Sequence, residues 1–480
     1  MFYSTPVEVN PVDHVASITE LAQDMAAGKV SSLIILGGVN PVYSAPADLK
    51  FAEAMKKVSF IVHHGLFRDE TAILSHWHIP STHFLEAWDD AKAHDGTASI
   101  VQPLIAPLYD GKTSQEVLTT LTKTPSLTAY EIVKNYWTGG AKGGDIEKTW
   151  RRALNDGIIQ STVNTSAAVS QAPSTGAGAA SSATLPRLQP QQGFDIVFRP
   201  DLSIFDGRYA NNGWLQEMPK PISTLTWDNA ALVSKATAEK LNLKSTLQFE
   251  GGQYDSDVIH IEVDGLSVNA PVWIAPGQPE DTVTLYLGYG RTHAGRVGNG
   301  LGFNAGSIRT TKNYWFATGA KVTKKDQTYP LAATQIQFTM EDRDPIRAID
   351  FSDYKKDLNF VHEKDGHNWL EEPSKDNSFF PHYDYKGYAW GMTIDLNSCI
   401  GCNACMAACV AENNIPVVGK AQVLRSREMH WIRVDRYYTG AAEDPETYFQ
   451  PVPCQQCEEA PCELVCPVDA TTHSAEGLND

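Results

Sequence analysis

All eight cysteines of this chain lie close to its C-terminal end, between residues 399 and 466. No cysteine precedes Cys399 in a sequence of 480 residues, although random placement would scatter them. They form two sets, Cys399-x2-Cys402-x2-Cys405-x3-Cys409 and Cys454-x2-Cys457-x4-Cys462-x3-Cys466-Pro467. We therefore expect residues 391–480 to form a separate module with its own chemistry.

The spacing within each set favours iron–sulfur clusters over zinc or disulfides. In bacterial ferredoxins the first three cysteines of such a run hold one cluster and the fourth ligates another. A structural zinc site closes with four ligands and has no use for the further thiols. Cysteines inside a three-residue loop also make poor disulfide partners for one another. Two sets in tandem indicate electron transfer rather than an isolated regulatory cluster, so all eight thiolates are predicted iron ligands.

The basic residues of this module lie between the two cysteine sets. Two interpretations stay open. The cations could raise the potentials of anionic clusters or dock a redox partner, or they could form the solvated face of a hairpin. The residues concerned are Lys420, Arg425, Arg427, Arg433 and Arg436.

The overall composition limits the class of protein. With 42% hydrophobic and 20% charged residues, the chain is globular and can bury real cores. Its net charge of -18 makes nucleic acid a poor partner, because a phosphate backbone is bound by clustered basic residues. No apolar run is long enough to span a membrane, and no secretory signal is visible after Met1. Export is left open.

The N-terminal portion, residues 1–155, has the pattern of an α/β domain. Residues 33–36 are an apolar run before Gly37 and Gly38, which predicts a buried strand and a turn. Residues 47–58 have helical spacing, and residues 59–63 predict a second strand. Asp69 is expected to cap a helix that begins over 69–74. This alternation indicates a parallel sheet.

Two linkers and a β domain are expected to follow. Residues 156–195 are rich in Ala, Ser, Gly, Pro and Gln, with Arg187 as the single charge between Asp156 and Asp195, and predict a linker. In residues 196–345, short β-branched runs alternate with glycine turns, which favours a barrel, with one helix over 230–241. Residues 346–390 predict a second, wrapping linker before the iron–sulfur domain at 391–480.

No catalytic constellation stands out in the cysteine-free portion. The histidines His63, His64, His76, His78 and His83 cluster in the sequence. Helix and strand geometry does not put them on one face, so we expect hydrogen-bonded side chains around a packed interface rather than metal ligands. Asp69 and Glu70 predict a helix start rather than an acid–base pair. Asn40-Pro41, after Gly37-Gly38, predicts a turn rather than a cofactor loop.

Three regions resemble the molybdopterin oxidoreductase superfamily. LGGVNPVYSAPADL (36–49) and FIVHHGLFRDETAILSHWHIPSTHFLE (60–86) resemble its α/β core. NAALVSKATAEKLNL (229–243) and GRVGNGLGFNA (295–305) resemble its dinucleotide-binding barrel. The cysteine module resembles the four-cluster iron–sulfur subunits of the same enzymes. Fusion of these parts in one chain is similar to the B subunits of bacterial alternative complex III, notably over 395–420 and 451–471.

This resemblance implies a molybdopterin-like scaffold that has lost its cofactor, beside a ferredoxin-like domain with 4Fe-4S clusters and a 3Fe-4S cluster. Such a subunit would relay electrons from an integral-membrane quinol-oxidising subunit towards monohaem and multihaem cytochrome c subunits. It would lie peripherally on the periplasmic face of the inner membrane. No catalytic residue of its own and no molybdopterin are expected.

The sequence departs from that family in the number of cysteine sets. The family has four, whereas two are present before Asp480. In the family, the fourth cysteine of one set ligates the cluster held by the first three cysteines of another set. Cys399, Cys402 and Cys405 would therefore need a ligand from the missing last set, and Cys409 would ligate the cluster of that last set. Cys454, Cys457 and Cys462 likewise need a ligand from the missing third set, to which Cys466 would contribute. We therefore expect an internal segment of a longer chain, which enters the α/β domain late at Met1. In a whole chain, Cys466 would complete the first set and Cys409 the second.

Two functions from different classes remain at this point. The first is an electron-transfer and scaffold subunit of a quinol-oxidising respiratory complex. The second is an active molybdenum or tungsten enzyme with bis-pterin chemistry whose clusters lie in the same chain. A soluble ferredoxin fused to a binding module is a third, weaker interpretation.

Overall fold

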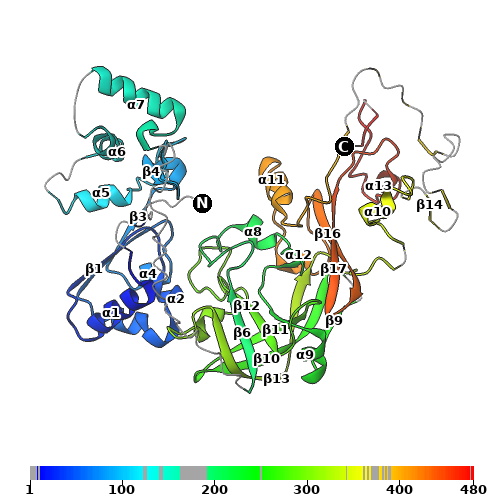
Figure 1. The fold of residues 1–480 in the computed structure, drawn as a ribbon, viewed down its shortest axis with the longest axis horizontal. Helices are drawn as coiled ribbons and strands as arrows, with labels where there is room; N and C mark the ends of the chain where they lie inside the picture. Colours follow the sequence, from blue (N-terminus) through cyan, green and yellow to red (C-terminus); the bar gives the residue numbers. More distant parts are fainter. Residues whose placement is uncertain are drawn as a thin grey trace, which may run out of the picture.

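The computed structural model describes residues 8, 11–122, 127–139, 144–162, 192–248, 251–341, 343–360, 363–364, 367–368, 378–380, 383, 386, 391–475 and 477–479. Most of the first predicted linker (156–195) and nearly half of the second (346–390) therefore lie outside the described residues. Figure 1 shows the α/β elements on one side, a β barrel in the centre and the cysteine-bearing segment beyond it.

The N-terminal elements form a parallel sheet covered by helices. Strands β1 (Ser32–Ile35), β2 (Phe60–Gly65) and β3 (Trp77–Pro80) pair in parallel in that order, which confirms the predicted sheet. The short helices α2 (Pro41–Ser44) and α4 (Glu70–Ile73) lie in the connections, with Asp69 as the predicted N-cap of α4. Helix α1 (His14–Ala26) packs against α3 (Phe51–Met55), and both contribute to one core with β1 and β2.

The single helix predicted over 47–58 is divided in two. A turn of 3-10 helix, η1 (Ala47–Leu49), precedes α3, and Lys50 between them has a φ of 46°. A left-handed residue cannot continue an α-helix, so the direction of the chain changes there. The change lets Phe51, Ala54 and Met55 face the core.

A second, smaller hydrophobic cluster follows. It is built by the hairpin of β4 (Asp89–Lys92) and β5 (Ala98–Val101) and by α6 (Ala129–Thr138) and α7 (Gly144–Asp156). The 3-10 turns η2 (Phe84–Glu86) and η3 (Gln160–Thr162) and helix α5 (Ser114–Thr119) complete this part. Ile100, Val133 and Trp150 form its centre, separate from the core under β1 and β2.

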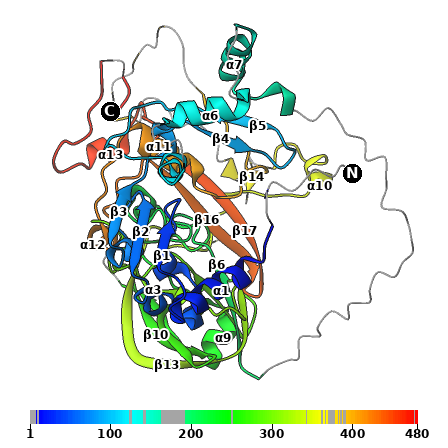
Figure 2. The same ribbon diagram turned by 90° about the vertical axis from the view of Figure 1, so that its left-hand side faces the viewer.

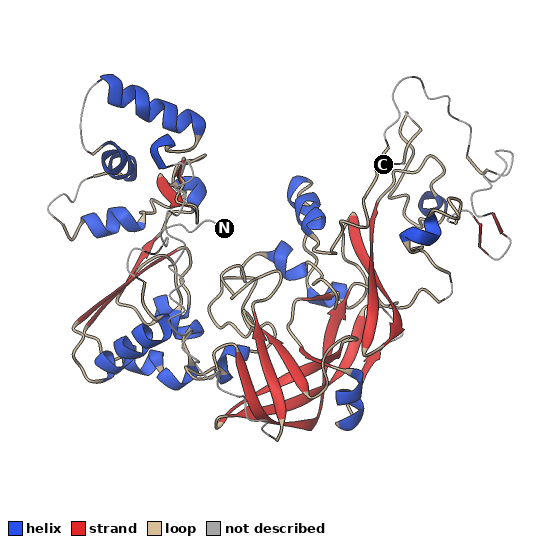
Figure 3. Cartoon of the chain, viewed as in Figure 1, coloured by secondary structure: helices blue, strands red, loops and turns tan. Residues whose placement is uncertain are grey.

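The central β domain is a closed barrel, as the sequence predicted. Its sheet has the order β7-β13-β6-β12-β8-β11-β10-β9, and β13 also pairs with β10, which closes the ring (Figure 3). The strands are β6 (Phe194–Arg199), β7 (Leu225–Thr226), β8 (Ala231–Val233), β9 (Ser245–Leu247), β10 (Gln253–Val263), β11 (Leu266–Ile274), β12 (Thr282–Tyr286) and β13 (Phe316–Ala333). Ile196, Ile259, Val283 and Leu285 are fully buried within it. The barrel core thus comes from alternate residues of each strand.

The helix predicted over 230–241 is shorter than expected. Residues Ala231–Val233 form β8, which pairs with both β11 and β12 and is buried. The helix, α9 (Lys235–Lys240), begins only after Ser234, whose hydroxyl accepts the N–H of Thr237 as an N-cap. The apolar run therefore serves the sheet because pairing on both sides outweighs its helical spacing. The remaining helical elements of the barrel region are α8 (Gly213–Glu217) and η4 (Ala305–Ile308).

A buried ion pair joins the α/β part to the barrel. The Glu70 carboxylate accepts from Arg291 Nε at 3.0 Å and Nη2 at 2.8 Å. It also accepts the backbone N–H groups of Thr292 and His293, and the Asn40 amide at 2.7 Å. Asn40 directly precedes α2, so the turn predicted at Asn40-Pro41 continues into a short helix, and Glu70 starts the predicted helix α4. Glu70 also holds the barrel, and Asn40 fixes its carboxylate; the sequence indicated neither role.

The cysteine-bearing segment packs against the barrel and continues into a long β ribbon. Its elements are α11 (Ala404–Glu412), α12 (Lys420–Val423), β16 (Ile432–Ala441), β17 (Asp444–Pro453) and α13 (Pro461–Leu464). Figure 2 shows β16 and β17 as two long neighbouring strands. Before them lie α10 (Phe351–Tyr354) and the two-residue strands β14 (Glu363–Lys364) and β15 (His367–Asn368). None of the described helices combines the length and the apolar character that a bilayer span requires.

Candidate iron–sulfur site

The first cysteine set spans a tight loop and the helix that follows it. Cys399 lies in a turn, where its N–H donates to the Asp395 carbonyl at 3.1 Å. Cys402 lies in the loop, and Cys405 and Cys409 follow one turn apart on α11. Two cysteines of the set therefore precede α11, and two lie on it.

Gly401 shapes this loop. It has a φ of 64°, which glycine adopts without strain. Its α-carbon also packs against the Phe449 ring of β17, and a Cβ there would overlap that ring. The loop between Cys399 and Cys402 therefore depends on glycine for both backbone conformation and space.

Helix α11 is fixed to the barrel rather than free. Asn403, with a left-handed φ of 62°, precedes the helix, and its buried amide donates to the Pro219 carbonyl at 2.7 Å. Met406 and Val410 on the inner face of α11 are 1% and 3% exposed and pack with Met218. These contacts leave the opposite face, with Cys405, exposed.

The segment that follows α11 is held by polar contacts from α8. Trp214 donates its indole N–H to the Ile415 carbonyl at 2.7 Å. Glu217 is 2% exposed and accepts the backbone N–H groups of Val418 and Gly419, the latter at 2.7 Å. Glu217 therefore fixes the backbone that follows α11 from within the barrel domain.

Two basic residues between the cysteine sets are anchors to the barrel. Lys420 Nζ lies 2.6 Å from Asp228 Oδ2 and donates to the Tyr329 hydroxyl at 3.0 Å. Arg436 is 2% exposed, and its Nε donates to the Ile222 carbonyl. Burial and pairing rule out a solvated hairpin face for these two residues, and they add an anchoring role that the sequence did not indicate.

The other basic residues of the segment remain at the surface. Arg433 pairs with Asp435 at 2.9 Å, and its side chain is 64% exposed. Arg425 and Arg427 are exposed. For these three residues, both interpretations of the sequence stay open.

The second cysteine set begins where the ribbon ends. Cys454 follows β17, and its N–H donates to the Trp431 carbonyl at 2.9 Å, which extends the ribbon pairing by one step. Cys457 follows in a loop, Cys462 lies on α13, and Cys466 comes directly after that helix. Pro461 starts α13 at a position where proline is well tolerated.

The thiols of the two sets have different environments. Burial raises the pKa of the Cys405 thiol, and the neighbouring Cys402 and Cys399 act in the same direction. The pKa of the Cys466 thiol is lowered, because the backbone N–H of Ala470 donates to its sulfur at 3.2 Å. Such N–H donation to sulfur is one of the contacts by which proteins adjust iron–sulfur centres.

All eight cysteines are free, and five of them are exposed: Cys402, Cys405, Cys454, Cys457 and Cys462. Among the residues that the structure describes, no three His, Cys, Asp or Glu side chains are gathered as metal ligands. Helices α11 and α13, which carry cysteines of different sets, are separated in the view of Figure 1. The donor set is nevertheless what iron–sulfur clusters need, namely accessible thiols without competing disulfides.

The clustered histidines have partners within the protein, as predicted. His63 and His64 are 0% and 1% exposed. The Nδ1 atoms of His63 and His78 are 3.0 Å apart, and His64 Nε2 lies 2.7 Å from the Lys112 carbonyl. His76 Nδ1 accepts the N–H of Ile61. The histidines thus join neighbouring strands and loops of the α/β part.

Comparison with known proteins places the similarity in the cysteine segment. Residues 398–470 match the family model described as the 4Fe-4S dicluster domain. The iron–sulfur cluster-binding subunit of menaquinone reductase from Nitratidesulfovibrio vulgaris is 43% identical over 90 residues, which cover 18% of this chain and 34% of that protein. The iron–sulfur subunit of arsenate respiratory reductase from Shewanella sp. ANA-3 is 34% identical over 88 residues, which cover 18% of this chain and 33% of that protein.

Protein NrfC from Escherichia coli K12 is 36% identical over 96 residues, which cover 20% of this chain and 39% of that protein. The matched segment thus spans about a third of the length of these curated relatives. Among solved structures, acetylene hydratase from Pelobacter acetylenicus is similar with a TM-score of 0.41 and 16% identity. That similarity covers 60% of this chain and 42% of the other. The relatives support iron–sulfur electron transfer in the C-terminal segment.

Proposed function

We propose that this chain is the iron–sulfur electron-transfer subunit of a membrane quinol-oxidising respiratory complex of the alternative complex III type. The observation that carries the proposal is the 4Fe-4S dicluster match over residues 398–470, which contains all eight cysteines. The similarity to the iron–sulfur subunit of menaquinone reductase supports a link to quinone chemistry. Electrons would pass from an integral-membrane quinol-oxidising subunit towards cytochrome c subunits on the periplasmic face.

In this proposal the eight cysteines ligate the clusters, which exchange single electrons when bound. The proposed cluster set includes 4Fe-4S clusters and a 3Fe-4S cluster. The division into an α/β domain (1–155), a linker (156–195), a barrel (196–345), a second linker (346–390) and a cluster domain (391–480) belongs to the same proposal.

The α/β part and the barrel act as a scaffold without a pterin cofactor. Support comes from the contacts that fix the first cysteine set. Asn403 donates to the Pro219 carbonyl, Glu217 accepts the N–H of Gly419, and Lys420 pairs with Asp228. A rigid platform holds a thiol set in place and limits the reorganisation that accompanies electron transfer.

Metal analysis of the purified complex tests the scaffold role. We expect iron and acid-labile sulfide without molybdenum or tungsten. A stoichiometric amount of either metal would instead support an active bis-pterin oxidoreductase. Membrane association is tested in parallel. The chain should copurify with an integral-membrane subunit and with polypeptides that carry covalent c-type haem, and isolation as a single soluble chain would refute the proposed partners.

Substitutions test the ligand assignment. Cys402→Ser and Cys457→Ser should each remove iron and diminish the EPR signal of the dithionite-reduced complex. Ser398→Ala is the matched control, because it lies beside Cys399 without supplying a thiol, and it should leave the iron content unchanged. Unchanged iron in both cysteine variants would show that these thiols are not ligands.

A further inference from the structure

An open cavity of about 740 Å³ lies on the outer surface of the barrel, away from the cysteines. Its floor is formed by outward-facing residues of neighbouring strands: Val197 and Arg199 of β6, Thr284 and Tyr286 of β12, and Leu232 of β8. In the strand register, Val197 lies opposite Thr284 and Arg199 opposite Tyr286. This volume lies within the usual range for small-molecule sites, roughly 300–1,000 Å³.

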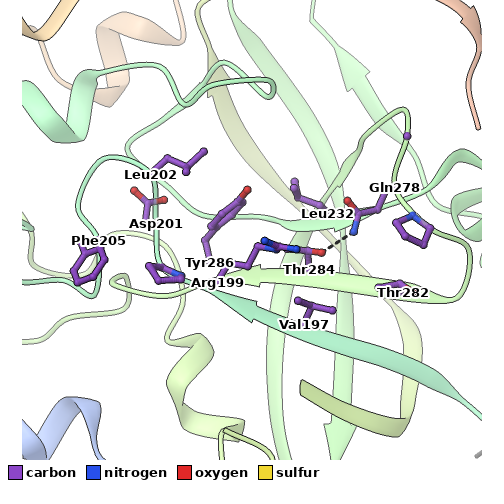
Figure 4. A pocket seen from close by; sticks show the side chains of 13 residues that line it. Val197, Arg199, Asp201, Leu202, Phe205, Leu232, Gln278, Thr282, Thr284 and Tyr286 are labelled. Atoms are coloured by element: carbon purple, nitrogen blue, oxygen red, sulfur yellow. Dashed lines mark hydrogen bonds between the residues drawn. The ribbon is translucent and has the colours of Figure 1, made fainter. Parts of the chain in front are cut away.

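The walls come from two loops. At one end, Leu202 and Phe205 are 56% and 44% exposed, so this wall is apolar. At the other end, Gln278 donates its amide to the Thr284 hydroxyl at 2.6 Å. Figure 4 shows Arg199 on the floor between these ends, beside Tyr286 and Thr284.

Among the described residues, the charged groups that line the cavity leave one cation, Arg199, without a counterion. Asp201 is 3% exposed, its Oδ1 accepts the N–H groups of Ser203 and Ile204, and its Oδ2 lies 3.3 Å from Lys220 Nζ. The negative charge at this lining residue is therefore offset from within the protein. The guanidinium of Arg199, by contrast, has no carboxylate partner among the described residues. The cavity thus presents a positive group on a chain of net charge -18.

We propose that this cavity binds a small organic anion, with a carboxylate or phosphate group on Arg199 and an apolar body against Leu202 and Phe205. A guanidinium offers two parallel N–H donors, which match carboxylate and phosphate oxygens. The hydroxyls of Thr284 and Tyr286 and the amide of Gln278 are neutral groups within the same cavity and suit the polar end of the ligand. The site is independent of the cysteines and of the proposed electron transfer.

Isothermal titration of the purified protein with benzoate and phenyl phosphate tests the proposal, with benzyl alcohol as the uncharged probe. We expect saturable binding of at least one anion and at least tenfold weaker binding of the alcohol. Binding of benzoate alone would assign the headgroup as a carboxylate, and binding of phenyl phosphate alone as a phosphate. No saturable binding of either anion would overturn the proposal.

Variants separate the site from general charge effects. Arg199 is exposed, so Arg199→Gln should fold and should weaken anion binding at least tenfold. Arg199→Lys keeps the charge but loses the paired donors, and it should bind with intermediate affinity. Arg296→Gln, an exposed arginine that does not line the cavity, is the matched control and should bind like the wild type. Equal affinities in all four proteins would refute the role of Arg199, and iron content should be unchanged throughout.

Discussion

Truncation of Glu70 should loosen the junction between the α/β part and the barrel. The Glu70 side chain is 9% exposed and that of Arg291 is 7% exposed. In Glu70→Ala, the Arg291 charge stays buried, and the N–H groups of Thr292 and His293 lose their acceptor. Removal of one partner of a buried ion pair typically costs about 3–5 kcal/mol. At about 2–4 °C per kcal/mol for a domain of this size, the melting temperature should fall by about 6–20 °C.

Differential scanning calorimetry at neutral pH measures this loss. Glu53→Ala, an exposed glutamate of the neighbouring α3, is the matched control and should change stability by less than about 0.5 kcal/mol. The double variant Glu70→Ala/Arg291→Met removes both charges and should recover part of the loss. A loss below about 1 kcal/mol in Glu70→Ala, or no recovery in the double variant, would refute the inference that this pair holds the junction.

The same pair predicts a pH dependence. Burial alone would raise the pKa of Glu70, but the hydrogen bonds from Arg291 and His293 outweigh it and lower the pKa to about 2. A carboxyl group whose pKa is lower in the folded than in the unfolded state stabilises the folded protein at a pH above its unfolded-state pKa. This stabilisation is lost as the pH falls towards the folded-state pKa. With 4.5 as the unfolded value, about 2 kcal/mol should be lost between pH 6 and pH 3. The stability gap between wild type and Glu70→Gln should narrow over that range, and a constant gap would contradict the assignment.

Three further substitutions probe the attachment of the cysteine segment. Gly401→Ala should destabilise the first cysteine loop by about 1–3 kcal/mol and slow cluster loading, which iron uptake measures. Gly391→Ala is the control and should have neither effect, because the space around its α-carbon is open. Lys420→Met leaves the fully buried Asp228 without its counterion and should lower the free energy of unfolding by about 3–5 kcal/mol. A double-mutant cycle with Asp228→Asn should give a coupling energy between the two residues of at least about 0.5 kcal/mol. Trp214→Phe removes one indole hydrogen bond and should cost about 1 kcal/mol in a urea titration.

The features that the sequence predicted correctly are those encoded by near neighbours. The parallel β1–β2 pairing followed from short apolar runs, and the Asp69 cap followed from its place before a helix. The barrel followed from β-branched runs separated by glycine turns. The errors arose where tertiary pairing competed with a local pattern. Residues Ala231–Val233 were expected to belong to the helix over 230–241. They form β8 instead, because β11 and β12 pair with them on either side.

The anchoring residues were not predictable, because each depends on a partner far away in the sequence. Lys420 and Arg436 were grouped with the other basic residues, and nothing local marks Asp228 as the partner of Lys420. Glu70 was interpreted only as a helix start for the same reason. A buried charge can be recognised only when both the burial and the partner are known, and neither follows from residue spacing.

The β16–β17 ribbon determines where the second cysteine set begins. Ile432 pairs with Pro453, and Cys454 N–H donates to the Trp431 carbonyl, so the chain leaves the ribbon directly beside the point where it entered. Neighbouring strands lie about 4.8 Å apart, and this spacing does not depend on how long the ribbon is. The other end of the ribbon contacts the barrel, where the Ala442 carbonyl in the turn accepts the N–H of Gly277 at 2.8 Å. The start of the second cysteine set is therefore fixed by strand pairing at one end of the ribbon, and the orientation of the ribbon by its contact with the barrel at the other.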